Sequence, residues 1–272
     1  MIDSRQNPAT VNAICRQCHI SGRLSRWPDG SALYNSLESL EQDTGACMTE
    51  LKCTHCHNPH VRGADAGAPD RKEHLAACVA CHEHLQAPDA ASAHSRHDST
   101  QASCLDCHMP RVVQGADVYN RSHRISSPTD PRILLPGMPN ACNLCHLDKS
   151  LAWTQASLES GWGKRVELPR GLEGLYGKEL SRPVGEAWLA HPNGTVRMVA
   201  AAAYARSSGA QEKLPQLIGF LDETNAYYRT RSLQIVERII GREFGEAEYS
   251  VAGPPEQRKV QVQRLLDQYS SR

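Results

Sequence analysis

Cys104-Leu105-Asp106-Cys107-His108 is one of five copies of a Cys-x-x-Cys-His pattern in the first half of this chain, and these copies decide its fold. The other four begin at Cys15, Cys53, Cys78 and Cys142. Two thiols three positions apart can form thioethers to one porphyrin, and the following His then binds its iron. Five copies within the first 150 of 272 residues exclude chance. We therefore interpret them as attachment sites for five haem c groups.

The motifs assign ten cysteines to porphyrin attachment and five histidines to iron binding. The ten thiols expected to form thioethers are Cys15, Cys18, Cys53, Cys56, Cys78, Cys81, Cys104, Cys107, Cys142 and Cys145. The expected proximal iron ligands are His19, His57, His82, His108 and His146. Cys47 is left over and could be a free thiol, an intermolecular link or a packing residue. Paired Cys-x-x-Cys units also hold zinc, but zinc does not require His after every second Cys, so the pattern favours haem over zinc and over a disulfide framework.

Eight further histidines could supply the second axial ligand of each iron. His55 lies inside an attachment loop and His191 lies in the second half of the chain, so we set both aside. The distal candidates are His60, His74, His94, His97 and His123, with His84 as a weaker candidate. All of them lie in the half that carries the motifs, which favours ligation over random surface placement. Met48 and Met109 are weaker still, because Met is more often a packing residue.

The first haem differs from the others. No free His lies between Ile20 and Leu51, so its second ligand would come from farther along the chain, from another subunit or from water. With water, that site would be open to a small molecule. No residue is assigned a catalytic role.

The sequence predicts a mainly α fold with much coil, in two domains. A haem-packed multihaem cytochrome c domain is expected over residues 1–160, and an α-helical domain of HEAT-like repeats over 161–272, after a Gly-rich stretch. A helix is expected to begin after Asn140 and to continue through the fifth motif toward Leu158. Beyond it, apolar residues at three- and four-residue steps predict helices over 196–204, 214–221, 227–240 and 260–269. Asn193–Arg197 and Asn225–Arg229 are similar segments about 32 residues apart, a spacing typical of helical repeats; an unrelated small bundle is the alternative.

Composition and charge indicate the class of partner. Phe occurs only twice, so we expect the haems to form much of the core and the haem-free chain not to fold. The formal net charge is zero, but each ferric haem adds roughly −1 through its propionates. An acidic haem domain argues against nucleic acid and for redox partner proteins or other subunits of an electron-transfer complex. The sequence shows neither a transmembrane stretch nor a signal peptide. Because haem c is attached outside the cytoplasmic membrane, we expect a processed chain in the periplasm or outside the cell.

Three segments resemble multihaem c-type cytochromes fused to helical repeats: Cys53 to His60, Cys104 to Pro110 and Pro139 to Lys149. The resemblance covers roughly residues 50–160. In such proteins a His pair precedes the Cys-x-x-Cys-His-Met-Pro segment and a lone His follows it, and His94, His97 and His123 match those positions. The resemblance implies low-spin haems with two His ligands, packed closely enough for electron hopping.

Three functions are compatible with this reading. The first is electron transfer, in which the helical domain is a docking or assembly surface, and it makes the chain a carrier rather than an enzyme. The second is a nitrite- or hydroxylamine-type multihaem oxidoreductase with an open site at the first haem; nitrite reductases usually carry Cys-x-x-Cys-Lys, which is absent here. The third is a subunit of a larger redox complex or cytochrome filament.

Overall fold

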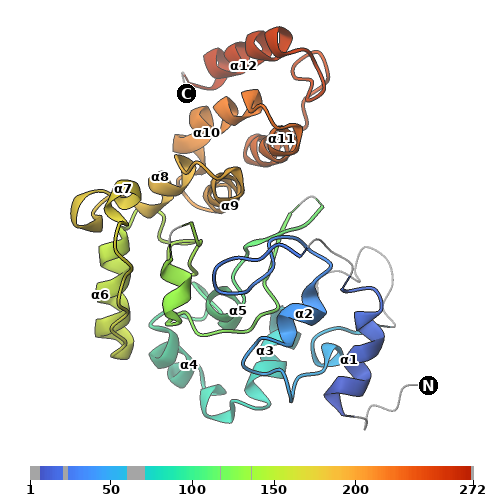
Figure 1. Cartoon of the computed structure of the whole chain (residues 1–272), viewed down its shortest axis with the longest axis vertical. Coiled ribbons are helices and arrows are strands. Elements are labelled where there is room, and N and C mark those ends of the chain that lie inside the picture. Colours follow the sequence, from blue (N-terminus) through green and yellow to red (C-terminus); the bar gives the residue numbers. More distant parts are fainter. Residues whose placement is uncertain (1–6, 21–23, 60–70, 117, 136, 271–272) are drawn as a thin grey trace. The chain divides into compact units, whose positions relative to one another are not determined.

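The computed structural model describes residues 7–20, 24–59, 71–116, 118–135 and 137–270. It is mainly helical, with one two-stranded sheet among the described residues and much coil (Figure 1), as the sequence predicts. The chain forms two compact units. The first contains residues 1–133 and 160–166, and the second contains 134–159 and 167–272.

The first unit is built from short elements separated by long loops. Its α-helices are α1 (Pro8–Arg16), α2 (Glu38–Gln42), α3 (Arg71–Val79), α4 (Pro88–Ser95) and α5 (Cys104–His108). Shorter 3₁₀ turns span Cys53–His55 and Glu83–Leu85. Strands β1 (Val113–Gln114) and β2 (Tyr119–Asn120) form an antiparallel hairpin.

The core of the first unit joins an early loop to this hairpin. The buried Trp27 donates its indole N–H to the Val112 carbonyl at 3.1 Å. The Gln114 N–H donates to the Leu33 carbonyl at 2.8 Å, and Leu37 is buried. Apolar burial of such side chains favours the folded state by roughly 1.5–3 kcal/mol each. The segment between the first two motifs contains only the short helix α2, so contacts with residues far along the chain contribute to its order.

The second unit consists mainly of helices. They are α6 (Leu151–Trp162, whose last residues belong to the first unit), α7 (Glu173–Tyr176), α8 (Val184–Leu189), α9 (Gly194–Tyr204), α10 (Ala210–Gly219), α11 (Ala226–Ile240) and α12 (Pro255–Tyr269). Shorter 3₁₀ turns span Pro131–Leu134, which begins in the first unit, Lys178–Leu180 and Phe220–Asp222. The four helices expected after residue 190 are confirmed, with somewhat different ends.

The helix expected from Asn140 to Leu158 is wrong in its first half. The fifth motif lies in turns, and α6 begins only at Leu151. The Asn140 side chain closes a turn by accepting the Asn143 N–H at 2.9 Å. The chain then runs beside the start of α8, where Gly185 donates its N–H to the Leu147 carbonyl at 2.9 Å. A Cβ on Gly185 would lie 2.9 Å from the Leu147 carbonyl oxygen, so only glycine allows this close approach.

The two similar segments of the helical part make the same contacts. The side chains of Asn193 and Asn225 cap α9 and α11 by accepting the N–H two residues later, each at 2.9 Å. Arg197 then folds back onto the carbonyls of His191 and Pro192, five and six residues earlier. Arg229 does the same to Glu223 and Thr224.

A third helix begins in a similar way. Arg258, the fourth residue of α12, donates to the Gly253 carbonyl five residues earlier. Helix α8 packs against α9, α9 and α10 against α11, and α10 against α12 (Figure 1). We call the set Arg197, Arg229 and Arg258 the repeat arginines. Their contacts support an internal repeat, while its assignment as HEAT-like stays a prediction.

The compact units do not divide at the boundary expected from sequence. Residues 134–159, including the fifth motif, belong to the second unit. The physical reason is the pairing of residues 147–150 with 183–185, which includes the bridge between Ser150 and Pro183. The division at 160/161 therefore stays a prediction about domains.

Candidate haem-binding site

His94 and the proximal His108 face each other across a gap of metal-binding size. Their ring centroids are 6.1 Å apart and their planes differ by 14°. Two imidazoles that bind one metal ion through Nε2, at about 2.0 Å each, have centroids roughly 6 Å apart. The two rings therefore have the spacing of two ligands of one metal ion.

The segment that carries His94 is held by hydrogen bonds with Gly161 and Trp162. Helix α4 ends at Ser95, and its C-cap residue Arg96 has a left-handed φ of 59°. Its guanidinium donates twice to the Gly161 carbonyl, at 3.1 and 2.8 Å. The Trp162 indole N–H donates to the His94 carbonyl at 2.7 Å. These bonds fix the direction in which His94 projects.

The proximal His57 has two candidate partners at similar distances. Its ring centroid is 6.0 Å from that of His74, with planes at 73°, and 6.2 Å from that of His123, with planes at 25°. One iron accepts only one of them as its second ligand. The charges of His19 and Glu38 also act on His123, which places His123 near the first motif as well as the second.

His84 lies 6.1 Å from the proximal His82, with ring planes at 71°. The two residues are only two positions apart, so chain connectivity alone brings their rings together. A side chain so close in sequence is poorly placed to reach the opposite face of the same porphyrin. His84 therefore remains the weaker candidate.

The bonds made by the ring nitrogens separate two classes of His. A neutral His binds a metal through one nitrogen while the other donates a proton to a fixed acceptor. His108 Nδ1 lies 2.8 Å from the Ser126 carbonyl and His97 Nδ1 lies 2.7 Å from the Ser95 carbonyl. A carbonyl only accepts, so these Nδ1 atoms carry the ring proton and Nε2 is the nitrogen without a proton.

The two histidines set aside from sequence show the opposite arrangement. His55 Nδ1 accepts the Lys52 backbone N–H at 3.2 Å, and His191 Nδ1 accepts the Asn193 N–H at 3.0 Å. Their proton must then lie on Nε2, which leaves no lone pair there for a metal. The hydrogen bonds thus support their exclusion.

The first and second motifs are joined by a buried amide. Asn12, on α1 just before Cys15, donates its side-chain N–H to the Leu51 carbonyl at 2.9 Å. Its side-chain oxygen accepts the Cys53 N–H at 2.9 Å. Each attachment segment therefore helps to position the other.

Cysteines of successive motifs also lie together. The thiols of Cys53 and Cys15 are hydrogen bonded, and burial together with Cys15 raises the pKa of Cys53 to about 12. A hydrogen bond from Cys78 lowers the pKa of Cys104 to about 6, whereas that of Cys78 is raised. Cys56 acts electrostatically on Cys78. These interactions link the four motifs of the first unit in the order in which they occur along the chain.

The fourth and fifth motifs are fixed by polar side chains within them. Ser103 and Asp106 cap α5 reciprocally, and Arg121 pairs with Asp106 at 2.7 Å. Asn143, inside the fifth motif, is fully buried. Its amide N–H bonds the His146 carbonyl at 3.0 Å, and its oxygen accepts the Thr154 hydroxyl at 2.6 Å. The proximal His146 lies against the ring of Trp153, with centroids 4.8 Å apart.

Burial lowers the pKa of three histidines at the site. It is the largest cause of the lowered pKa of His57, His108 and His123. In each case desolvation disfavours the charged imidazolium. The neutral ring is the form that binds a metal.

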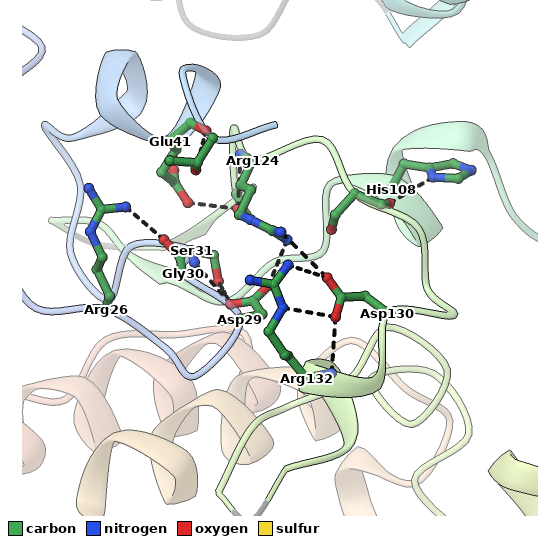
Figure 2. A network of polar contacts seen from close by, with 12 residues as sticks. Arg26, Asp29, Gly30, Ser31, Glu41, His108, Arg124, Asp130 and Arg132 are labelled. Atoms are coloured by element: carbon green, nitrogen blue, oxygen red, sulfur yellow. Dashed lines mark hydrogen bonds and ion pairs between the residues drawn. The ribbon is translucent and has the colours of Figure 1, made fainter. Parts of the chain in front are cut away.

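A buried polar network supports the segment that carries His123 (Figure 2). The Arg124 guanidinium lies 3.6 Å from Asp29 and 3.4 Å from Asp130. Glu41, 1% exposed, accepts the His123 N–H at 3.0 Å and the Ser122 hydroxyl at 2.7 Å. Burial raises the pKa of Glu41, since desolvation outweighs these bonds.

Some site residues lie elsewhere or were missed. His60 lies outside the described residues, and Met48 is exposed. Cys47 is half-buried, and burial together with the nearby Cys81 raises its pKa. Cys47 also acts electrostatically on Cys78. Sequence reasoning missed Glu38 and Glu41, because a carboxylate in a loop-rich segment gives no signal of its partner. It also missed Asn12 and Asn143, although Asn143 stands within a motif.

Two kinds of feature are absent from the part of the chain that the structure describes. No group of three or more His, Cys, Asp or Glu side chains there is arranged to hold a metal ion. None of the helices in those ranges has the length and apolar character needed to cross a membrane.

Comparison with known proteins links part of the chain to a family. No curated protein and no solved structure matches the chain significantly. The family model of cytochrome c552 matches residues 84–167, a segment with two of the five motifs complete and with the His94–His108 pair. Residues 84–167 are thus similar to cytochrome c552, a family of multihaem c-type cytochromes, and the similarity implies haem c iron as the cofactor.

Proposed function

We propose that this protein transfers electrons through five covalently bound haem c groups, most of them with two His ligands. The observation that carries the proposal is the His94–His108 pair, whose 6.1 Å centroid separation fits two axial ligands of one iron. The cytochrome c552 match over the same segment supports it. A bound haem supplies one-electron chemistry between ferrous and ferric iron.

The protein's own residues would hold and insulate these groups. The ten motif cysteines would form the thioethers and the five motif histidines would bind the irons. A second His excludes substrate from the metal, so such haems carry electrons without binding a reactant. The neighbouring thiols of Cys15 and Cys53, and of Cys78 and Cys104, support short separations between successive haems.

The ring pairs and the tautomers support a proposal for the distal ligands. We assign His94 to the fourth haem, and His74 or His123 to the second. His97, whose Nδ1 faces the Ser95 carbonyl, remains a candidate for another iron, as do His60 and, more weakly, His84. His123 could instead serve the first haem, since His19 acts on it electrostatically.

A second candidate function rests on the first haem. If His123 serves the second iron, the first iron keeps an open position, and reduction of a small oxyanion there would make the protein an oxidoreductase. Cytochrome c552 similarity is compatible with both functions. We favour electron transfer, because every proximal position in the five motifs is His.

The helical repeats would act as a docking or assembly surface for redox partner proteins or other subunits. Such repeats stack through their neighbours and present extended surfaces. The repeat arginines support this architecture. Because haem c is attached outside the cytoplasmic membrane, we infer a periplasmic or extracellular location.

Two measurements on the holoprotein test the proposal. Mass spectrometry of the intact chain should show five haems, and low-temperature EPR should show mainly low-spin ferric signals. Fewer than five attached haems would refute the count. A stoichiometric high-spin ferric signal that nitrite or cyanide perturbs would favour the oxidoreductase over the carrier.

A further inference from the structure

The proximal His of the first motif bonds a carboxylate. His19 Nδ1 lies 3.0 Å from Glu38 Oε2. The proximal His108 instead faces a neutral backbone carbonyl, that of Ser126, at 2.8 Å. Two proximal ligands of the same chemical type therefore have acceptors of different charge.

The Glu38 side chain is held in place. Its second oxygen accepts the Ser36 backbone N–H at 2.9 Å, and Ser36 has a left-handed φ of 67° that turns the chain toward it. The Glu38 side chain is 23% exposed, whereas the His19 side chain is 59% exposed, so solvent reaches the contact from the His19 side.

The two elements that carry this pair are also tied together. The Ser39 N–H donates to the His19 carbonyl at 3.3 Å, and Arg16 Nε donates to the Ser39 hydroxyl at 3.1 Å. Arg16 also pairs with Asp43. The start of α2 is thus fixed beside the end of the first motif, and the bond from Glu38 to His19 is part of the fold.

A carboxylate changes a metal-bound imidazole more than a carbonyl does. It draws the Nδ1 proton toward itself and makes Nε2 a stronger donor to the metal. A stronger donor favours ferric over ferrous iron and therefore lowers the reduction potential, since hydrogen bonding around the axial ligands tunes haem.

We propose that Glu38 is a positioning residue that lowers the reduction potential of the haem attached at Cys15 and Cys18. The inference rests on the proposed function, because it requires a haem at this motif. It adds a direction to the electron path: with Glu38 present, the first haem accepts an electron less readily and gives one up more readily. Such a haem is suited to pass electrons out to an acceptor.

The test compares two charge-removing variants of the holoprotein. Glu38→Gln keeps the size of the side chain and removes its charge, while Glu50→Gln removes one charge from an exposed side chain in the same unit. Each haem is followed by its EPR signal during a redox titration. In Glu38→Gln one of the five signals should shift to more positive potential, while Glu50→Gln should leave all of them unchanged.

Two further variants keep the test decisive. Glu38→Asp retains the charge and should shift the same signal less than Glu38→Gln does, which a purely structural role would not predict. In a Cys15→Ser/Cys18→Ser variant the signal that responds to Glu38 should be absent. Together these results assign the effect to the first haem.

Three outcomes would overturn the inference: no shift in Glu38→Gln, an equal shift in Glu50→Gln, or a response that persists without Cys15 and Cys18. Mass spectrometry of the wild-type chain separates this failure from that of the proposed function. A haem at Cys15 and Cys18 with an unresponsive potential refutes only the role of Glu38. A chain without haem there refutes the proposed function at that motif.

Discussion

The carboxylate of Glu41 accepts a hydrogen bond from the backbone N–H of His123, 82 residues later in the chain. It also accepts the Ala32 N–H at 2.8 Å. One buried side chain thus holds both the early loop and the segment of a candidate iron ligand.

Glu41→Ala should destabilise the holoprotein by about 1–3 kcal/mol, since several donors would be left buried without an acceptor. Denaturant unfolding of the purified holoprotein measures this. Glu50→Ala, on the exposed surface, is the matched control and should change stability by less than about 0.5 kcal/mol. Equal effects of the two substitutions would contradict the role given to Glu41.

His94→Ala should convert one haem from low spin to high spin, because His94 is the ring that faces His108. EPR should show one new high-spin ferric signal with the number of attached haems unchanged. His55→Ala is the control, since its Nδ1 accepts a backbone N–H, and it should leave every signal low-spin. An unaltered spectrum of His94→Ala would rule out the assignment.

Single substitutions can distinguish the ligand roles of His74 and His123, the two neighbours of His57. If His74 binds the second iron and His123 the first, His74→Ala and His123→Ala should each create a high-spin signal, and their g-values should differ. If His123 binds the second iron, only His123→Ala should alter that haem. Resolved EPR signals decide between the two, and no change in either variant would exclude both residues.

Asp130 should make the first unit sensitive to acid. Burial raises its pKa, but hydrogen bonds from Arg132 and the charges of Arg132 and Arg124 outweigh burial and lower it. A lowered folded-state pKa stabilises the protein above the ordinary value of about 3.9, and this contribution disappears as the pH falls through the folded pKa.

Asp130→Asn should therefore lower the melting temperature at pH 7 through a loss on the order of 1 kcal/mol. The difference in melting temperature between Asp130→Asn and the wild type should disappear as the pH falls below about 4. Melting curves of holoprotein between pH 3 and 7 measure this. If the difference in melting temperature stays constant across that range, the ion pairs of Asp130 are not the cause of the stability loss.

Asn143→Ala should destabilise the second unit by roughly 1–3 kcal/mol, because several buried partners lose their bonds. Proteolysis of the holoprotein should detect earlier cleavage near the fifth motif. Gln216→Ala, at an exposed position of α10, is the control and should leave cleavage unchanged. Equal resistance of both variants would contradict the role of Asn143.

The sequence could predict what depends on local spacing. Haem attachment is predicted from the Cys-x-x-Cys-His spacing, because two thioethers to one porphyrin require it. The later helices are predicted from apolar residues at three- and four-residue steps. The helix expected after Asn140 is wrong because the residues following the fifth motif pair with residues 183–185, a contact that no local pattern records. The same contacts join residues 134–159 to the second compact unit, while the division at 160/161 stays a prediction about domains.

Prediction from sequence is limited in a similar way for the hydrogen-bond partners of the histidines. Sequence reasoning could exclude His55 and His191 by their positions, and their hydrogen bonds support that choice. It could not find Glu38 beside His19 or Glu41 beside His123. These pairs depend on how loops fold back, which is decided by tertiary packing rather than by the identity of the neighbouring residues.

The repeat arginines determine where the helical part tolerates changes in length. Each binds carbonyls five or six residues before it, so an inserted residue within that loop would break the bonds. The spacing between successive arginines nevertheless falls from 32 residues to 29. The first interval contains α10, whereas residues 241–254 of the second interval form no helix. An insertion at 206–209 should be accommodated, whereas one between Asn225 and Arg229 should not, nor one beside the buried Tyr249, whose hydroxyl donates to the Leu221 carbonyl.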